Sequence, residues 1–175
     1  MPLAGVPEIW REWVAQARRG DREAFGRLAE AHWDRLVRLA RSIVGELEAE
    51  DAVQEGLIFA WQRLGGLLEP ERFTSWLTRI VFRGCLRRAR QVRVRRSMEE
   101  VPEPAVSGNP GAAIDVWRLL ARLAPGQRAV LHLTVVEGMT DTEIGEALGI
   151  AAGSVRSHRR RARQSIERLM GGGKS

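Results

Sequence analysis

The chain has 175 residues, of which 44% are hydrophobic and 29% charged, with a formal net charge of +6. This composition is typical of a soluble globular protein with one medium domain or two small ones. No stretch approaches the eighteen or more continuous apolar residues of a membrane span, so we expect no membrane insertion. The first residues lack a basic segment followed by an apolar run, so we expect no secretion signal.

Cysteine and histidine usage narrows the chemistry further. Cys85 stands alone, which excludes a disulfide within the chain and favours a reducing cytoplasm. His32, His132 and His158 are scattered, with no Cys or His partner at metal-ligand spacing. We therefore expect no metal site and no cofactor.

The first half of the chain predicts three helices. Apolar residues recur at steps of three and four from about residue 20 to 43, and again from 46 to 64 after Gly45. The second helix buries Val53, Leu57, Ala60, Trp61 and Leu64, although Gly56 inside it costs about 1 kcal/mol relative to alanine. A third helix begins at Phe73 and continues to Arg96.

A second stripe on the helix 46–64 carries Asp51, Gln54, Glu55 and Ile58. Acids at a helix start can simply stabilise the helix dipole, by about 0.3–1 kcal/mol each. That explanation suits Glu48 and Glu50, whereas Glu55 lies too far into the helix. The acids spread around the helix instead of converging, which argues against a metal site.

Positive charge is concentrated in two zones. Residues 76–96 hold eight arginines and no acid, residues 97–114 hold three acids and no base, and residues 115–175 carry a balance of +4. A general solvated surface mixes its signs more evenly, so this pattern indicates two contacts with a polyanion.

The acidic strip 97–114 contains three prolines and two glycines and no apolar periodicity, which predicts an extended linker. It divides the chain into a domain over 1–96 and a domain over 115–175. Strand signals are weak throughout, so we expect an all-α protein of two small helical domains joined by a flexible acidic linker.

The second domain predicts a helix-turn-helix. Helices are expected over 117–124 and 127–136, and a capping box of Thr140 and Glu143 begins a third. Gly149 permits the tight turn that ends this third helix. A fourth helix from Ala152 buries Val155, Ala162, Ile166 and Leu169, whose offsets lie on one stripe.

The fourth helix carries the segment SVRSHRRRARQ, whose polar residues project away from that stripe. Arginine can bridge phosphates or bind guanine in the major groove. An ordinary solvated face is the alternative, but such faces mix acids with bases, and no acid occurs here through Gln164. We therefore expect DNA binding by Ser154, Arg156, Ser157, Arg159, Arg160 and Arg163.

The order of these segments resembles the extracytoplasmic-function (ECF) sigma factors of bacterial RNA polymerase. GDREAFGRLAEAHWDRLVRLARSIVG resembles the opening helices of region 2, AEDAVQEGLIFAW the polymerase-binding helix, and FTSWLTRIVFRGCLRRAR the −10 promoter helix. The stretch from LARLAPGQ to RARQSI resembles region 4, which binds the −35 element. The likeness covers roughly residues 18–96 and 115–169.

The resemblance implies roles for the segments. The stripe Asp51, Gln54, Glu55 and Ile58 would bind an arginine-rich coiled coil of core RNA polymerase. Residues 64–72 would hold a base extruded from the −10 element. Trp76 would either stack at the melted edge or pack in the core. The −10 contacts would come from Trp76, Arg79, Arg83, Arg87, Arg88 and Arg90, and the −35 contacts from the six residues of the fourth helix.

The resemblance also implies promoter DNA and an anti-sigma factor as partners. It further implies that the protein acts in transcription initiation and has no catalytic activity of its own. The sequence argues against three other functions. A helix-turn-helix regulator would leave the acidic stripe unexplained, and a sigma mimic that titrates an anti-sigma factor would need neither arginine zone. A DNA enzyme would need a nucleophile with a base, or converging carboxylates, which the sequence does not offer.

Overall fold

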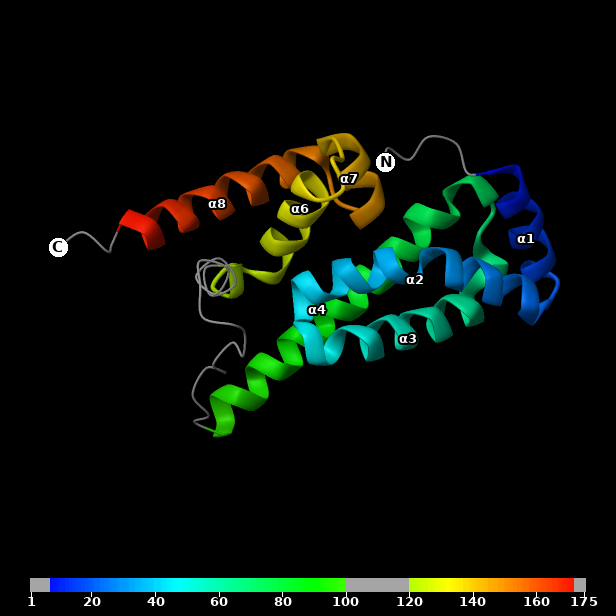
Figure 1. Cartoon of the computed structure of the whole chain (residues 1–175), viewed down its shortest axis with the longest axis horizontal. Coiled ribbons are helices and arrows are strands. Elements are labelled where there is room, and N and C mark those ends of the chain that lie inside the picture. The colour runs from blue at the N-terminus through cyan, green and yellow to red at the C-terminus, as the bar shows by residue number, and fades with distance from the viewer. Residues whose placement is uncertain (1–6, 100–119, 172–175) are drawn as a thin grey trace.

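The structure, a computed structural model, describes residues 7–99 and 120–171, with side chains described for 7–92 and 120–170. Within these ranges every regular element is a helix and no strand occurs, which confirms the all-α prediction (Figure 1). The elements are α1 (Glu8–Arg18), α2 (Arg22–Val44), α3 (Glu46–Arg63), η1 (Leu64–Gly66), η2 (Pro70–Arg72), α4 (Phe73–Glu99), α6 (Pro125–Val135), α7 (Asp141–Leu148) and α8 (Ala152–Gly171).

Local sequence signals set the boundaries of α2 and α3. Asp21 caps α2, and its carboxylate accepts hydrogen bonds from the backbone N–H groups of Glu23 and Ala24 at 2.9 and 3.0 Å. Gly45, at φ +89°, ends α2 and leads directly into α3. A positive φ strains any residue with a Cβ, which explains why glycine separates these helices.

Helix α1 was not among the predicted helices. It packs on α2 through the fully buried Val14 and the nearly buried Ala17, with Trp10 and Trp13 against the same core. These four residues recur at steps of three and four, so the signal was present in the sequence and was missed.

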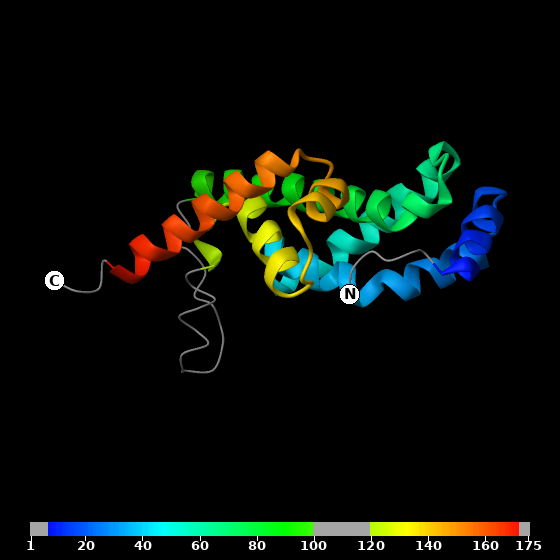
Figure 2. The same cartoon turned by 90° about the horizontal axis from the view of Figure 1, so that it is seen from above.

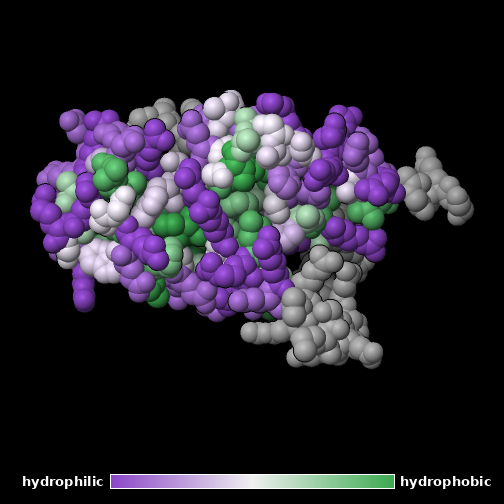
Figure 3. All heavy atoms as spheres, turned by 180° about the vertical axis from the view of Figure 1, so that it is seen from behind, coloured by the Kyte–Doolittle hydropathy of each residue, from purple (hydrophilic) through white to green (hydrophobic). Residues whose placement is uncertain are grey.

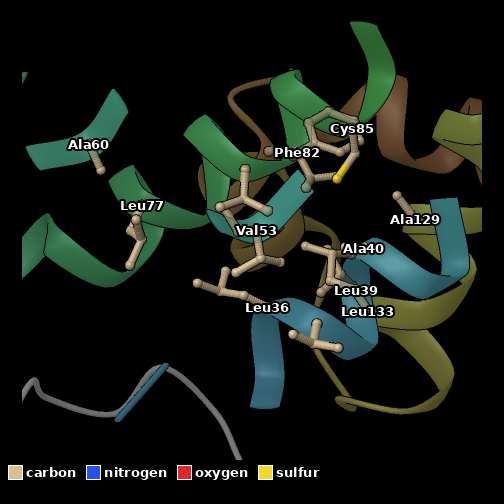
Figure 4. Packing of buried hydrophobic residues seen from close by; sticks show 14 of the residues in the cluster. Leu36, Leu39, Ala40, Val53, Ala60, Leu77, Phe82, Cys85, Ala129 and Leu133 are labelled. Atoms are coloured by element: carbon tan, nitrogen blue, oxygen red, sulfur yellow. The ribbon is translucent and has the colours of Figure 1, made fainter. Parts of the chain in front are cut away.

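The core of the first half lies between α2, α3 and α4 (Figure 4). Gly56 permits the close approach of α3 to α4, because a Cβ there would lie 2.8 Å from Cγ2 of the buried Val81. The helix-propensity cost of this glycine is therefore offset by packing. Cys85 belongs to the same core, and burial raises the pKa of its thiol to about 12.

His32 joins its own helix α2 to α4 from inside this core. Its Nδ1 lies 2.7 Å from the carbonyl oxygen of Leu28, and its Nε2 lies 3.0 Å from Oγ1 of Thr74 on α4. Because a carbonyl only accepts, Nδ1 donates and Nε2 accepts from the Thr74 hydroxyl. Burial lowers the pKa of His32, partly opposed by the Leu28 hydrogen bond and reinforced by Arg35.

This lowered pKa predicts acid sensitivity of the fold. Between the two pKa values the unfolded chain binds more protons than the native one, so His32 contributes stability above about pH 6.5 that is lost as the pH falls towards its native pKa. We expect a lower melting temperature at pH 5 than at pH 7.5. In the His32→Gln variant the difference between these two melting temperatures should be smaller. Thermal unfolding followed by circular dichroism tests this, since His132 and His158 are common to both proteins. An equal pH dependence in the two would contradict it.

The second half begins with α6, which starts at Pro125 instead of the predicted residue 127. Proline suits the first helical position, where no N–H donor is needed, and Oε1 of Gln127 accepts a hydrogen bond from the N–H of Ala124. The predicted helix over 117–124 lies partly outside the described residues, which contain only its last turn.

The predicted helix-turn-helix is confirmed in α7 and α8. The Thr140 and Glu143 capping box is formed, and Gly149 ends α7 in the left-handed region at φ +68°. Val155 and Ala162 are fully buried and attach α8 to its domain, whereas Ile166 and Leu169 are half-buried. The turn is tight, since a Cβ on Gly145 would lie 2.8 Å from the carbonyl oxygen of Ile150.

The two halves of the protein pack against each other. Helix α6 lies on α2 and α7 lies on α4 (Figures 1 and 2). Ala129 and Leu133 of α6 face Leu39 and Ala40 of α2, so a single hydrophobic core runs through both halves (Figure 4). Helix α4 continues to Glu99, three residues into the predicted linker, and the other linker residues lie outside the described part of the chain.

Candidate nucleic-acid and protein-binding surfaces

The predicted acidic stripe lies on the outer face of α3. Asp51, Gln54, Glu55 and Ile58 are all exposed, and Ile58 retains 60% of its accessible surface. An exposed large apolar side chain among carboxylates stabilises no part of this fold. The stripe is therefore a candidate protein-binding surface.

Arg88 of α4 reaches over to this stripe. Its Nε donates to Glu48, its Nη1 lies 2.8 Å from Oε1 of Glu55, and its Nη2 lies 3.5 Å from Oδ2 of Asp51. The hydrogen bond to Glu48 raises the pKa of Arg88 further above its usual value. Sequence reasoning assigned Arg88 to the −10 contacts and Glu48 to the helix dipole. It missed their contact because the two lie forty positions apart on different helices.

The other arginines of α4 fall into two groups. Arg83, Arg87 and Arg90 are exposed. Arg79 is half-buried under the second half of the protein, where its Nη2 donates to the carbonyl oxygen of Glu146 at 2.7 Å and its side chain covers Gly149. Three of the predicted −10 arginines are thus displayed together, while Arg79 is covered.

Trp76 packs at the edge of the core. It is half-buried, and its ring lies 6.0 Å from that of the buried Phe73. Of the two alternatives for Trp76, this position favours packing over stacking on DNA.

A polar cluster joins the two halves. Arg35 Nε donates to Oε2 of Glu137 at 3.0 Å, and its Nη1 lies 3.3 Å from Oγ1 of Thr78. Nε2 of His132 lies 3.9 Å from the other oxygen of Glu137. The Glu137 side chain is only 10% exposed and that of Arg35 is 22% exposed. Sequence reasoning missed this cluster, because Arg35 and Glu137 are separated by 102 positions.

Two partly buried side chains of this contact have shifted pKa values. Desolvation lowers the pKa of Arg128, whose Nη2 donates to the carbonyl oxygen of Ile43. Desolvation also lowers the pKa of His132; Glu137 opposes this shift, and Arg38 and Arg35 reinforce it. Both shifts follow from the depth of the contact between the halves.

The arginines of α8 are only partly free. Arg156 and Arg160 are exposed, and Arg163 pairs with Glu167 one turn further on at 2.8 Å. Arg159 forms a bidentate ion pair with the carboxylate of Asp141 on α7. This acid is nearby only because the turn brings the start of α7 beside α8.

The two serines of α8 that were predicted to contact DNA differ in their hydrogen bonding. The Ser157 hydroxyl donates to the carbonyl oxygen of Gly153 at 3.0 Å, within its own helix. Ser154 is exposed near the start of α8. The six predicted −35 residues thus lie on one helix, and of these Ser154, Arg156, Arg160 and Arg163 are exposed, although Nη1 of Arg156 also lies 4.0 Å from Oδ2 of Asp141.

Most of the rear face of the molecule is hydrophilic, with smaller hydrophobic areas between (Figure 3). In the described residues, no three His, Cys, Asp or Glu side chains gather as a metal site would require. None of the helices in this part of the chain is long and apolar enough to cross a membrane.

Two family models match the chain and define its class. The model of Sigma-70 region 2 matches residues 28–95, and that of Sigma-70, region 4 matches residues 113–166. These ranges contain most of α2, all of α3, most of α4, all of α6 and α7, and most of α8. The class is therefore that of sigma-70 proteins with these two regions.

Curated relatives narrow the class. The chain is 35% identical to the ECF RNA polymerase sigma factor SigM of Mycobacterium tuberculosis over 164 residues, 91% of this chain and 84% of SigM. It is 31% identical to the RNA polymerase sigma factor CnrH of Cupriavidus metallidurans over 176 aligned positions, 90% of this chain and 92% of CnrH. The chain belongs to the ECF RNA polymerase sigma factors.

Solved structures agree with this fold. CnrH in complex with the cytosolic domain of CnrY matches with a TM-score of 0.67 and 28% identity, over 96% of this chain and all of CnrH. The sigma factor RpoE in complex with the anti-sigma factor NepR, from Bartonella quintana, matches in fold with a TM-score of 0.61.

Proposed function

We propose that this ECF sigma factor binds core RNA polymerase through the outer face of α3 and contacts promoter DNA through α4 and α8. The exposed stripe of Asp51, Gln54, Glu55 and Ile58 carries the proposal. Acids around an apolar centre suit a basic protein partner, since charge complementarity steers association and the apolar residue is desolvated on binding. The arginine-rich coiled coil implied by the family resemblance is such a partner.

The DNA contacts are divided between the two halves. Arg83, Arg87 and Arg90 are assigned to the phosphates of the −10 region, and the outward residues of α8 to the −35 element. These elements lie about 25 base pairs apart, roughly 85 Å at 3.4 Å per base pair. The halves must therefore separate before both can bind. The chain between Glu99 and Leu120 permits this, with a reach of about 75 Å when fully extended.

A protein partner that holds the factor inactive is part of the proposal. Two proteins of similar solved structure, CnrH and RpoE, are each complexed with another protein, CnrY and the anti-sigma factor NepR. We assign such a partner to this chain, and a cytoplasmic site of action without catalysis of its own. A helix-turn-helix regulator is disfavoured by the α3 stripe, and a sigma mimic by the two arginine zones.

Charge reversal on α3 tests the proposal. We expect Asp51→Arg with Glu55→Arg to weaken binding to a bacterial core RNA polymerase at least about 100-fold, because each close charge pair at an interface contributes about 1.5–7 kcal/mol. Equilibrium binding of the fluorescently labelled full-length protein measures it, and circular dichroism verifies the fold.

The matched control is Glu30→Arg with Asp34→Arg, the same reversal four residues apart on the exposed surface of α2. This pair should leave core affinity within a few-fold of wild type. A wild-type protein that binds DNA but not core polymerase would overturn the proposal and leave the chain a DNA-binding regulator.

A further inference from the structure

Arg88 sits between the two surfaces to which function has been assigned. It belongs to α4, beside the exposed Arg87, yet its guanidinium contacts three carboxylates of α3. Its side chain is only 21% exposed, whereas those of Asp51 and Glu55 are 67% and 68% exposed. The acids therefore stay accessible to a partner while Arg88 is held.

The charges of this cluster do not balance. One guanidinium faces the carboxylates of Glu48, Asp51 and Glu55, which leaves two negative charges in excess. A cationic partner that docks on α3 satisfies this excess and brings a like charge close to Arg88. Like charges this close repel one another at the effective dielectric of a protein surface. This repulsion weakens the hold of the carboxylates on Arg88 and favours its release.

A second surface for binding lies near Arg88. It is one residue from Arg87 and two from Arg90 on α4, the helix assigned to the −10 phosphates. Neighbouring positions point in different directions around a helix, but the arginine side chain is long. Rotamer changes can carry its guanidinium from the α3 carboxylates towards the face of Arg87 without movement of the helix. A phosphate is a suitable second partner, because guanidinium binds phosphate as it binds carboxylate.

We propose that Arg88 exchanges partners: it holds the α3 carboxylates in the free protein and binds a −10 strand phosphate once polymerase occupies them. The exchange rests on the proposed function of α3 and α4. It links the two bindings, so that polymerase strengthens the DNA contact and DNA strengthens the polymerase contact by the same factor. The residue assigned only to DNA is then also a competitor of polymerase.

The test compares Arg88→Gln with Arg87→Gln in two states. Binding of a fluorescein-labelled single-stranded 20-mer of mixed sequence is measured for the full-length protein alone and for holoenzyme with a saturating bacterial core polymerase. In the free protein Arg88→Gln should lower the slope of log Kd against log salt by much less than Arg87→Gln does, because Arg88 is held by the α3 carboxylates. In the holoenzyme it should lower the slope of log Kd against log salt by about 0.7, the value of one single-strand phosphate contact.

Arg87→Gln is the matched control. Arg87 is the exposed neighbour of Arg88, and it pairs with no carboxylate in the part of the chain that the structure describes. It should lower the slope equally in both states. Arg88→Gln should also bind core polymerase several-fold more tightly than wild type, since the carboxylates lose their internal competitor. Arg88→Lys, which keeps the charge, should restore most of the holoenzyme slope, and melting temperatures verify folding.

The outcomes separate the inference from the function it rests on. A wild-type protein without core affinity would sink the proposed function. A wild-type protein that binds core, with Arg88→Gln changing DNA binding equally in both states or in neither, would overturn the exchange alone.

Discussion

Gly145→Ala is expected to unfold or displace the helix-turn-helix and to weaken −35 binding at least about tenfold, the discrimination carried by one good base contact. The added Cβ would lie 2.8 Å from the carbonyl oxygen of Ile150 and 3.4 Å from the backbone nitrogen of Ala152. Both are main-chain atoms, so no rotamer change relieves the contact. The turn between α7 and α8 must therefore move, and α8 with it.

The balance of energies sets the sign of this effect. Alanine gains about 1 kcal/mol over glycine in a helix interior. Forcing a methyl group into a packed site typically costs about 1–3 kcal/mol, and here the obstacle is backbone instead of a yielding side chain. We expect a net loss of stability of roughly 1–2 kcal/mol, measured by thermal unfolding of the full-length protein.

Gly153→Ala is the matched control on α8. The nearest atom to its added Cβ is Nη2 of Arg156 at 3.8 Å, an ordinary contact, and the position is exposed. This variant should melt at or slightly above the wild-type temperature. A DNA duplex that the wild-type holoenzyme selects from a random library serves as the −35 ligand. The affinity of each variant for this duplex is then measured. A Gly145→Ala protein as stable and as tightly bound as Gly153→Ala would contradict the argument.

Signals that act over a few residues were readable from the sequence. Gly45, the Thr140 and Glu143 capping box and Gly149 each fix a helix end through contacts within one turn, and each prediction is confirmed. Periodicity likewise identified the exposed stripe on α3. The missed helix α1 carried the same kind of signal, so its omission was an error of interpretation and not a limit of the sequence.

Contacts between helices that lie far apart in the sequence could not be predicted from helical spacing. The partners of Arg88 lie on α3, and the partner of Arg159 lies at the start of α7. Spacing along one helix shows which residues share a face, but not which face of another helix lies opposite. The function of α4 was therefore predicted as one arginine surface, whereas the structure divides its arginines between exposed, paired and covered positions.

The packing of the two halves against each other was the feature hardest to predict from the sequence. A proline- and glycine-rich strip predicts a linker but carries no information about whether the domains it joins touch. The apolar residues of α2 and α6 could equally have been buried within their own halves of the protein. The ion pair of Arg35 and Glu137 shows that the contact between the halves is specific, because two oppositely charged side chains meet there with little access to water.

That ion pair makes the second large prediction. Glu137→Arg should shift the protein from closed to separated halves by roughly 2–3 kcal/mol, below the 3–5 kcal/mol of a fully buried pair because water reaches part of Arg35. The new cation would face Arg35 and lie beside His132, with Arg38 also near. Small-angle X-ray scattering of the full-length protein should show a larger radius of gyration, while circular dichroism shows the helical content retained.

Two further variants distinguish loss of the pair from a general charge effect. Glu30→Arg makes the same charge change on the exposed surface of α2 and should leave the radius of gyration unchanged. Arg35→Glu combined with Glu137→Arg restores opposite charges across the contact and should recover much of the compact form. If the swap stays as expanded as Glu137→Arg, the pair does not determine closure. The apolar contact of Ala129 and Leu133 with α2 would then be what holds the halves together.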